Sequence, residues 1–345
     1  MIREIFKVFL KLGLLGFGGP AAHIAMMRDE VVVKRKWLSE AEFLDLVGAS
    51  NLIPGPNSTE LAIHIGHRMG GWKGLLTAGV SFIFPAFVSV LTLAVYYEKF
   101  GSLPELTSIL TGIRPVVTAI IAIALIQFRK NAVPGYWQLL LAICAGVASF
   151  FIPETFAILL SGILALTWRG KKFSVSPELF FIFLKIGSVL FGSGYVLLSF
   201  LKEEFVLQRG WLTEIQLLDA VSIGQFTPGP VFTTATFIGY VIDGYSGAVL
   251  ATLGIFLPSF VFVALSAPYI SKLRSSENLS RFLDGVIAGS FALMVLVTFS
   301  LGKSGFVDWK TSLVGIISFL ILLRFPKFNS AWLVILGGSI GYIFF

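Results

Sequence analysis

Two Pro-Gly-Pro triplets, at residues 54–56 and 228–230, constrain the fold of this chain more than any other feature. Proline lacks a backbone N–H and restricts the residue before it, yet it suits the first position of a helix. Each triplet therefore predicts the end of one half-helix and the start of another. Both lie in apolar surroundings, so the broken backbone has to be accommodated there.

The composition indicates an integral membrane protein. The chain of 345 residues is 56% hydrophobic and only 13% charged, which is more apolar surface than a soluble fold of this size can bury. In a bilayer, broken backbone is tolerated only where it is buried in protein or lines a cavity, and transporters place their binding sites at such breaks. The single cysteine, Cys144, excludes an intrachain disulfide and a cysteine-based metal site, and no cofactor is expected.

Apolar runs predict the membrane-spanning helices, and the two broken elements lie among them at about 41–69 and 215–242. The runs of the first half are at about 5–27, 74–97, 106–128, 134–151 and 154–168, and those of the second half at about 179–201, 248–271, 282–302, 311–323 and 331–345. Glycine clusters at 16–20 and 192–194 should kink the first helix of each half, and ordinary close helix packing is the alternative. The predicted fold class is all-α integral membrane.

The second half of the sequence repeats the first. With an offset of 174 residues, positions that match include Lys11 with Lys185, Arg35 with Arg209, Trp37 with Trp211 and the two Pro-Gly-Pro triplets; after one residue is dropped, Gly66, Gly71, Gly74 and Pro85 match Gly239, Gly244, Gly247 and Pro258. This long match predicts a duplication into residues 1–172 and 173–345, joined at the basic segment 169–172.

The distribution of basic residues predicts that the halves are inverted. If each broken element is a re-entrant hairpin, the loops divide Lys and Arg sixteen against seven; if each element spans, they divide twelve against eleven. The re-entrant arrangement gives five spans per half, an odd number. We therefore expect inverted repeats, both termini on the non-cytoplasmic face, and two hairpins that enter the membrane from opposite sides.

The half-helix that follows each break predicts an anion site. Free backbone N–H groups and the positive end of the helix dipole favour a compact anion there, and hydroxyl groups add donors. The predicted substrate-binding residues at the breaks are Pro54, Gly55, Pro56, Asn57, Ser58, Thr59, Pro228, Gly229, Pro230, Val231, Phe232, Thr233 and Thr234. Ordinary structural turns are the alternative.

Charged residues inside apolar runs extend this candidate list. Lys11 and Lys185 are repeat mates that either bind substrate or extend their ammonium groups to the interface. Arg114 has no mate, because Ile287 occupies the matching place, and it is a candidate for substrate binding. A structural ion pair with Asp284 is its alternative.

The first hairpin adds titratable groups that the second lacks. Glu60 and His64 share one helix face and are the candidates for proton coupling, although a carboxylate near a helix N-terminus also complements the helix dipole. His23 is expected at the membrane interface. Zinc is not expected, since His64 and His67 alone supply two ligands.

Three motifs resemble those of the chromate ion transporter family. They are Phe17-Gly18-Gly19-Pro20, Pro54-Gly55-Pro56-Asn57-Ser58, and the segment from Thr227 to Tyr240 that contains the second triplet. The resemblance covers nearly the whole chain. It implies a bacterial or archaeal multi-pass plasma membrane protein that exports chromate by secondary transport, with two inverted halves and the Pro-Gly-Pro segments near the site.

The sequence leaves several functional questions open. Sulfate is an alternative substrate, and coupling to protons or to anion exchange is undecided. A membrane-embedded phosphatase of the undecaprenyl-diphosphate type is the alternative function, but it needs an arginine beside Ser58, and none is close in sequence. The lipid bilayer is the expected environment, no nucleic acid is expected, and a homodimer remains open.

Overall fold

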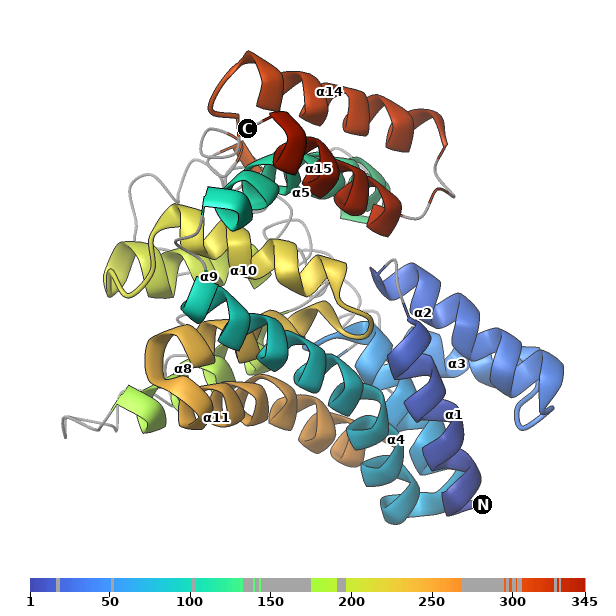
Figure 1. Ribbon diagram of the computed structural model, residues 1–345. Coiled ribbons are helices and arrows are strands. Elements are labelled where there is room, and N and C mark those ends of the chain that lie inside the picture. The colour runs from blue at the N-terminus through green and yellow to red at the C-terminus, as the bar shows by residue number, and fades with distance from the viewer. Residues whose placement is uncertain are drawn as a thin grey trace.

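The protein is described by a computed structural model, in which every regular element of the described residues is helical (Figure 1). The structure describes residues 1–16, 19–50, 53–100, 104–132, 175–190, 197–267, 306–325 and 330–344, with a few single residues between them. The elements are α1 (Ile2–Leu15), α2 (Gly19–Arg28), the π-helix η1 (Asp29–Lys34), α3 (Glu40–Ser50), α4 (Asn57–Phe100), α5 (Pro104–Ala132), α8 (Val175–Val189), α9 (Leu197–Leu201), the π-helix η3 (Lys202–Gln208), α10 (Glu214–Phe226), the 3₁₀ turn η4 (Val231–Thr233), α11 (Thr234–Ser266), α14 (Trp309–Arg324) and α15 (Ser330–Phe344).

Three helices among the described residues are long and apolar enough to cross a membrane. They lie at Asn57–Phe100, Thr107–Ile126 and Val231–Ser266, and they contain the predicted run 74–97 and most of the runs 106–128 and 248–271. The predicted runs 311–323 and 331–345 form the shorter helices α14 and α15. The runs 134–151, 154–168 and 282–302 lie outside the described residues, apart from a few single positions.

The helices α4 and α11 each contain a reversal. Non-helical backbone at Gly70 and Gly71 divides α4 into a first arm, residues 57–69, and a second arm, residues 72–100. Asp243 and Gly244 divide α11 in the same way into 234–242 and 245–266. The first arms end where the sequence predicted the broken elements to end.

The two arms of α4 pack closely, and so do those of α11. A Cβ atom built on Gly74 would collide with the carbonyl group of Gly66, and one on Gly247 with that of Gly239. Glycine at these four positions therefore lets the second arm return along the first. The second arms of α4 and α11 pack together and run in opposite directions (Figure 1).

The run 5–27 is not the single span that the sequence predicted. It forms two helices, α1 and α2, and the chain then doubles back along α1, since Lys11 pairs with Glu30 at 2.7 Å and Glu4 with Arg35 at 3.0 Å. Non-helical backbone at Gly16 and the proline near the start of α2 account for the break. The run 179–201 is divided likewise into α8 and α9.

This arrangement also corrects the predicted position of the N-terminus relative to the basic segment 28–36. The sequence argument placed Arg3 and Lys7 on one side of the membrane and the basic segment 28–36 on the other. The ion pair between Glu4 and Arg35 brings these regions to the same end of the molecule. The prediction that residues 1–7 and 28–36 lie on opposite sides of the membrane is therefore wrong.

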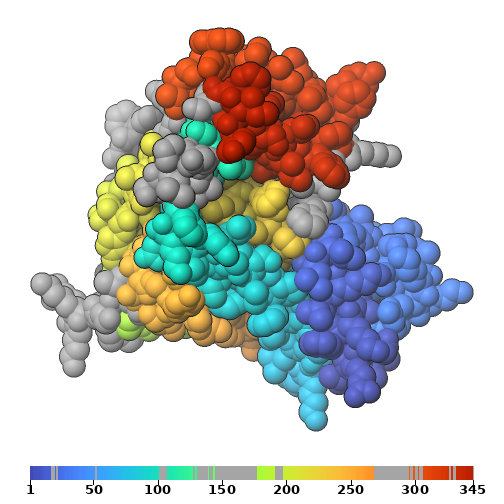
Figure 2. Space-filling model, in the orientation of Figure 1, coloured from blue at the N-terminus to red at the C-terminus, as the bar shows by residue number. Residues whose placement is uncertain are grey.

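The N-terminal and C-terminal elements lie at different ends of the molecule. In Figure 2, α1 to α3 in blue gather on one side and α14 and α15 in red lie at the top, with parts of α4, α5 and α10 between them. The helix α5 packs against α14 and α15, whereas α4 packs against α1 and α11. The core around the two breaks is thus formed by α1, α4, α8 and α11.

We predict that the close return of α4 tolerates no side chain at Gly74. Gly74→Val should lower the free energy of unfolding by about 1–3 kcal/mol or more, because the added atoms would meet the Gly66 backbone. Leu76→Val is the control, since Leu76 lies on the same arm and its side chain is 54% exposed. Thermal unfolding in detergent measures both; equal losses would contradict the packing.

Candidate anion site at the two helix breaks

Each Pro-Gly-Pro break is held by a carbonyl group from the other half of the chain. The N–H of Gly55 donates to the carbonyl oxygen of Leu190 at 2.7 Å, and the N–H of Gly229 donates to that of Gly16 at 2.8 Å. Gly16 and Leu190 lie at the C-terminal ends of α1 and α8, where helix carbonyls lack partners of their own. The two hydrogen bonds are related by the same offset of 174 residues as the sequence repeat.

Glycine is required at both breaks. Gly55 has a φ of 137° and Gly229 a φ of 96°, values that side-chain-bearing residues rarely adopt. A Cβ on Gly55 would meet the carboxyl of Glu60 and, at 2.5 Å, the hydroxyl of Ser259. A Cβ on Gly229 would lie 2.7 Å from the Cβ of Ala86. Each break therefore lies against the second arm of the other half's long helix.

Buried polar groups gather in the first turns of α4, after the first break. Ser58, Thr59, Glu60 and His64 are all at most 3% exposed. Glu60 accepts a hydrogen bond from the hydroxyl of Ser259 at 3.4 Å through one carboxyl oxygen. Its other oxygen, the Thr59 hydroxyl and the His64 Nε2 have no partner among the described residues. Unsatisfied polar atoms at this depth mark a place suited to a polar ligand.

The second break offers fewer free donors. The Thr233 hydroxyl donates to the carbonyl of Pro230 at 2.7 Å, and that of Thr234 donates to the carbonyl of Val231 at 2.8 Å. Each hydroxyl has one proton, so neither has a second to give to an anion. Phe232 is buried and apolar. The predicted residues of the two breaks thus occupy matching places but differ in chemistry.

His23 belongs to this region and not to the membrane interface, where the sequence analysis placed it. It is 2% exposed, with Nε2 2.8 Å from the Gly16 carbonyl oxygen and Nδ1 3.2 Å from the Ser58 hydroxyl. The doubling back of the chain after Gly16 carries it there. Its position directly after the kink predicted at 16–20 was the sequence signal for this placement.

Lys11 and Lys185 lie in matching ion pairs rather than beside the breaks. The ammonium group of Lys11 is 2.7 Å from the carboxylate of Glu30, and that of Lys185 is 2.6 Å from that of Glu204. The hydrogen bond from Lys11 lowers the pKa of Glu30 below its usual value. The lysine side chains are about half exposed, which fits the interfacial alternative.

Arg114 lies in a buried network that joins three helices. Its guanidinium group donates two hydrogen bonds to the carboxylate of Asp219, at 2.8 and 2.9 Å, and the Tyr97 hydroxyl donates to the same carboxylate at 3.0 Å. The residues come from α5, α10 and α4. An ion pair was the alternative for Arg114, but the partner is Asp219; Asp284 lies outside the described residues.

Arg114→Ala and Asp219→Ala should each cost about 3–5 kcal/mol of stability, because each leaves one buried charge without its partner. The double variant Arg114→Met with Asp219→Leu should recover most of that loss. Thermal unfolding in detergent measures these effects. Transport by the double variant then shows whether Arg114 also serves the anion path: a stable protein that fails to transport would support that role, and normal transport would contradict it.

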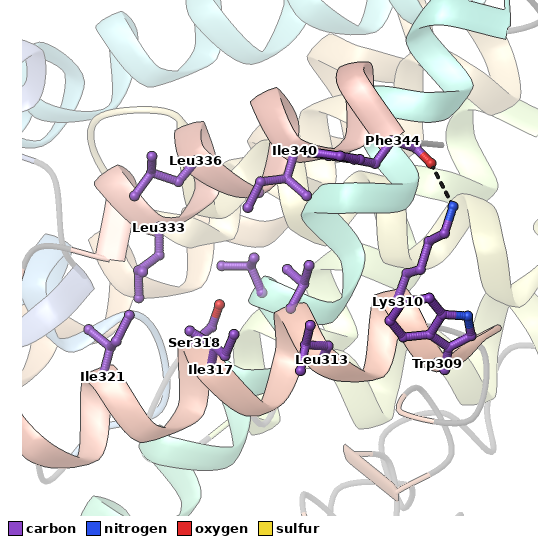
Figure 3. Close-up of a pocket in the computed structure, with 13 residues that line it drawn as sticks. Trp309, Lys310, Leu313, Ile317, Ser318, Ile321, Leu333, Leu336, Ile340 and Phe344 are labelled. Carbon is purple, nitrogen blue, oxygen red and sulfur yellow. Dashed lines mark hydrogen bonds between the residues drawn. The ribbon is translucent and has the colours of Figure 1, made fainter.

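A groove at another place on the described surface has the wrong chemistry for an anion. It has a volume of about 370 Å³ between α14, α15 and α5, and its lining is almost entirely apolar (Figure 3). The ammonium group of Lys310 at its edge donates to the carbonyl oxygen of Phe344 at 3.1 Å. Among the described residues, no three His, Cys, Asp or Glu side chains are grouped to hold a metal ion.

Comparison with known proteins gives full-length relatives. A chromate transport protein of Cupriavidus metallidurans is 31% identical over 99% of this chain and 93% of its own length. A probable chromate transport protein of Synechococcus elongatus is 28% identical over 100% of this chain and 95% of its own. YwrA of Bacillus subtilis, an uncharacterised transporter, is 30% identical over only 37% of this chain and 72% of its own length. No solved structure matches.

The sequence profile of the chromate transporter family matches this chain twice, at residues 3–166 and 177–342. These two matches together cover nearly all of the sequence, including both helix breaks. The resemblance carried by the three motifs is thereby confirmed, and a carrier rather than an enzyme is what the family implies. The chain is a membrane protein that belongs to the chromate transporter family.

Proposed function

We propose that this protein is a secondary transporter that exports chromate, or a similar tetrahedral oxyanion such as sulfate, across the bacterial or archaeal plasma membrane. The observation that carries the proposal is the cluster of buried, unpartnered polar atoms directly after the first break of a chain whose relatives are named chromate transport proteins. The phosphatase alternative is not favoured, because the family is one of transporters.

The proposed site is the N-terminal turn of α4. Thr59 and Glu60 direct their backbone N–H groups to the carbonyl of Pro56, and the N–H of Ser58 is the backbone donor of this turn that we propose for an anion. The Thr59 hydroxyl adds a donor, and the positive end of the helix dipole favours negative charge. The second break closes the opposite side through η4, which contacts α4.

Glu60 and His64 are the proposed proton-coupling residues. Both are buried, and each has a polar atom without a partner among the described residues. An ionised carboxylate is costly at such a place without a cation, and a dianion nearby increases that cost. Proton binding at Glu60 would therefore favour anion binding beside it.

We also propose that residues 1–172 and 173–345 are inverted repeats, each with a re-entrant hairpin. Support comes from the two profile matches, from the opposite directions of the second arms of α4 and α11, and from contacts that recur at matching positions. The recurring ion pairs are Lys11–Glu30 with Lys185–Glu204, Arg28–Glu40 with Lys202–Glu214, and Arg35–Glu4 with Arg209–Glu178.

The positive-inside rule then places the N-terminus in the cytoplasm. Three segments of the first half, residues 1–9, 28–40 and 66–74, together carry eight basic residues. The matching segments of the second half, residues 175–183, 202–214 and 239–247, carry two. The first set is Arg3, Lys7, Arg28, Lys34, Arg35, Lys36, Arg68 and Lys73, and the second is Lys202 and Arg209. This orientation replaces the one that the sequence analysis predicted for the N-terminus.

Single cysteines at the two helix reversals test the inversion. Trp72 and Tyr245 are repeat mates, and each is 63% exposed. With Cys144 replaced by alanine, Trp72→Cys should react with an impermeant reagent from the cytoplasmic side only, and Tyr245→Cys from the opposite side only. Reaction of both from one side would exclude inverted halves, and exchanged sides would reverse the orientation.

A series of variants tests the site. Gly55→Val and Gly229→Val should abolish chromate transport, because both breaks lack room and need an unusual φ. Thr59→Ala should weaken binding by about 1–2 kcal/mol, the value of one lost donor. Thr233→Ala is the matched control, since its hydroxyl proton is already used within its own turn.

Transport of labelled chromate into inverted vesicles measures these effects, and sulfate should compete because it shares charge and shape with chromate. Wild-type transport by both glycine variants would show that the breaks are only structural turns. Equal effects of Thr59→Ala and Thr233→Ala would contradict the assignment of the donor to the first break.

A further inference from the structure

The side chain of His23 connects the two breaks. Its Nε2 lies 2.8 Å from the Gly16 carbonyl oxygen, which also accepts the N–H of Gly229 at 2.8 Å. Its Nδ1 lies 3.2 Å from the hydroxyl of Ser58, which is two residues after the first triplet. The ring packs edge-on against Phe82 at 5.4 Å between centroids, so its orientation is fixed.

The partners of the ring determine where its protons lie. A carbonyl oxygen only accepts, so Nε2 carries a proton in every state of this arrangement. In a neutral ring Nδ1 has a lone pair, and the Ser58 hydroxyl donates its proton to it. In a protonated ring Nδ1 donates to the Ser58 oxygen instead. The Ser58 proton is then released from the ring and can point elsewhere.

The connection exists in one half only. Leu190 takes the place of Gly16 in the second half and accepts the N–H of Gly55. At the positions that match His23 and Ser58, however, the second half has Leu197 and Phe232, whose side chains are buried and apolar. The shared backbone contact therefore does not need the histidine, which indicates a role beyond holding the break.

We propose that His23 controls the direction of the Ser58 hydroxyl and so couples proton binding to oxyanion binding. This inference rests on the proposed function, since it assumes an oxyanion at the N-terminal turn of α4. With a neutral ring, Ser58 presents only lone pairs to the anion, which repels it. When a proton binds at Nδ1, the hydroxyl turns and donates to an anion oxygen. No covalent bond forms or breaks beyond this proton transfer.

Any test has to distinguish protonation of His23 from protonation of the other titratable groups around it. The helix α2 packs against α1, η1 and α4. The titratable side chains on these elements, up to the reversal of α4, are Arg3, Glu4, Lys7, Lys11, Asp29, Glu30, Lys34, Glu60, His64, His67 and Arg68. The ion pairs described above occupy Glu4, Lys11 and Glu30, so Glu60 and His64 are the main competitors for a proton at the site.

Calorimetry of oxyanion binding in buffers of different ionisation enthalpy tests the proposal. It gives the number of protons taken up per anion, with chromate as the probe at mildly alkaline pH, where it is a dianion. The wild-type protein should take up a proton on binding, and His23→Gln should lose that contribution and bind about tenfold more weakly, as expected for one donor. His67→Gln, whose ring lies edge-on to Trp72, is the matched control and should behave as wild type.

A double-variant cycle separates coupling from independent effects. Ser58→Ala should remove the same proton uptake as His23→Gln, and the double variant should lose no more than either single variant. Glu60→Gln and His64→Gln should leave the His23 contribution in place. Unchanged proton uptake in His23→Gln, or fully additive losses with Ser58→Ala, would overturn the role of His23. If the wild-type protein binds neither chromate nor sulfate, the proposed function itself fails.

Discussion

Two backbone hydrogen bonds hold the centre of this protein, one from Gly55 to Leu190 and one from Gly229 to Gly16. A broken helix in an apolar environment exposes N–H and C=O groups that water cannot reach, and each unpaired group is costly. Here the donor of each break meets the open C-terminal carbonyl of a short helix from the other half. The glycines, the prolines and the doubling back of α1 and α8 all serve this pairing, because each brings the broken ends to the same place.

The repeat supplies the scaffold, and the differences between its copies supply the chemistry. The ion pairs, the helix reversals and the glycine contacts recur at matching positions. Several exchanges break the symmetry by replacing a polar or charged residue of the first half with a less polar one of the second, among them His23 by Leu197, Ser58 by Phe232, Glu60 by Thr234 and Arg114 by Ile287. The oxyanion site that we propose at the first break therefore has no chemical equivalent at the second.

The features that could be predicted from the sequence are those that depend on residues close together along the chain. Proline and glycine set the breaks at 54–56 and 228–230, and the ends of the broken elements agree with the helix reversals at Gly71 and Gly244. The partners of Arg114 and Lys11 were not predictable, because they depend on which segments lie together after the chain doubles back. Hydropathy alone could not divide residues 5–27 into two short helices, since both are apolar. The same error placed His23 at the interface.

The reciprocal pairing of the breaks also has a consequence for biosynthesis. The N–H of Gly55 needs the carbonyl of Leu190, which is synthesised 135 residues later. Until α8 has entered the membrane, the first hairpin carries a broken backbone without its acceptor, and its apolar surroundings make that state costly. The second break has its acceptor, Gly16, in place from the start. The amino-terminal half of this protein therefore reaches its final form only after α8, the first helix of the carboxy-terminal half, has joined it.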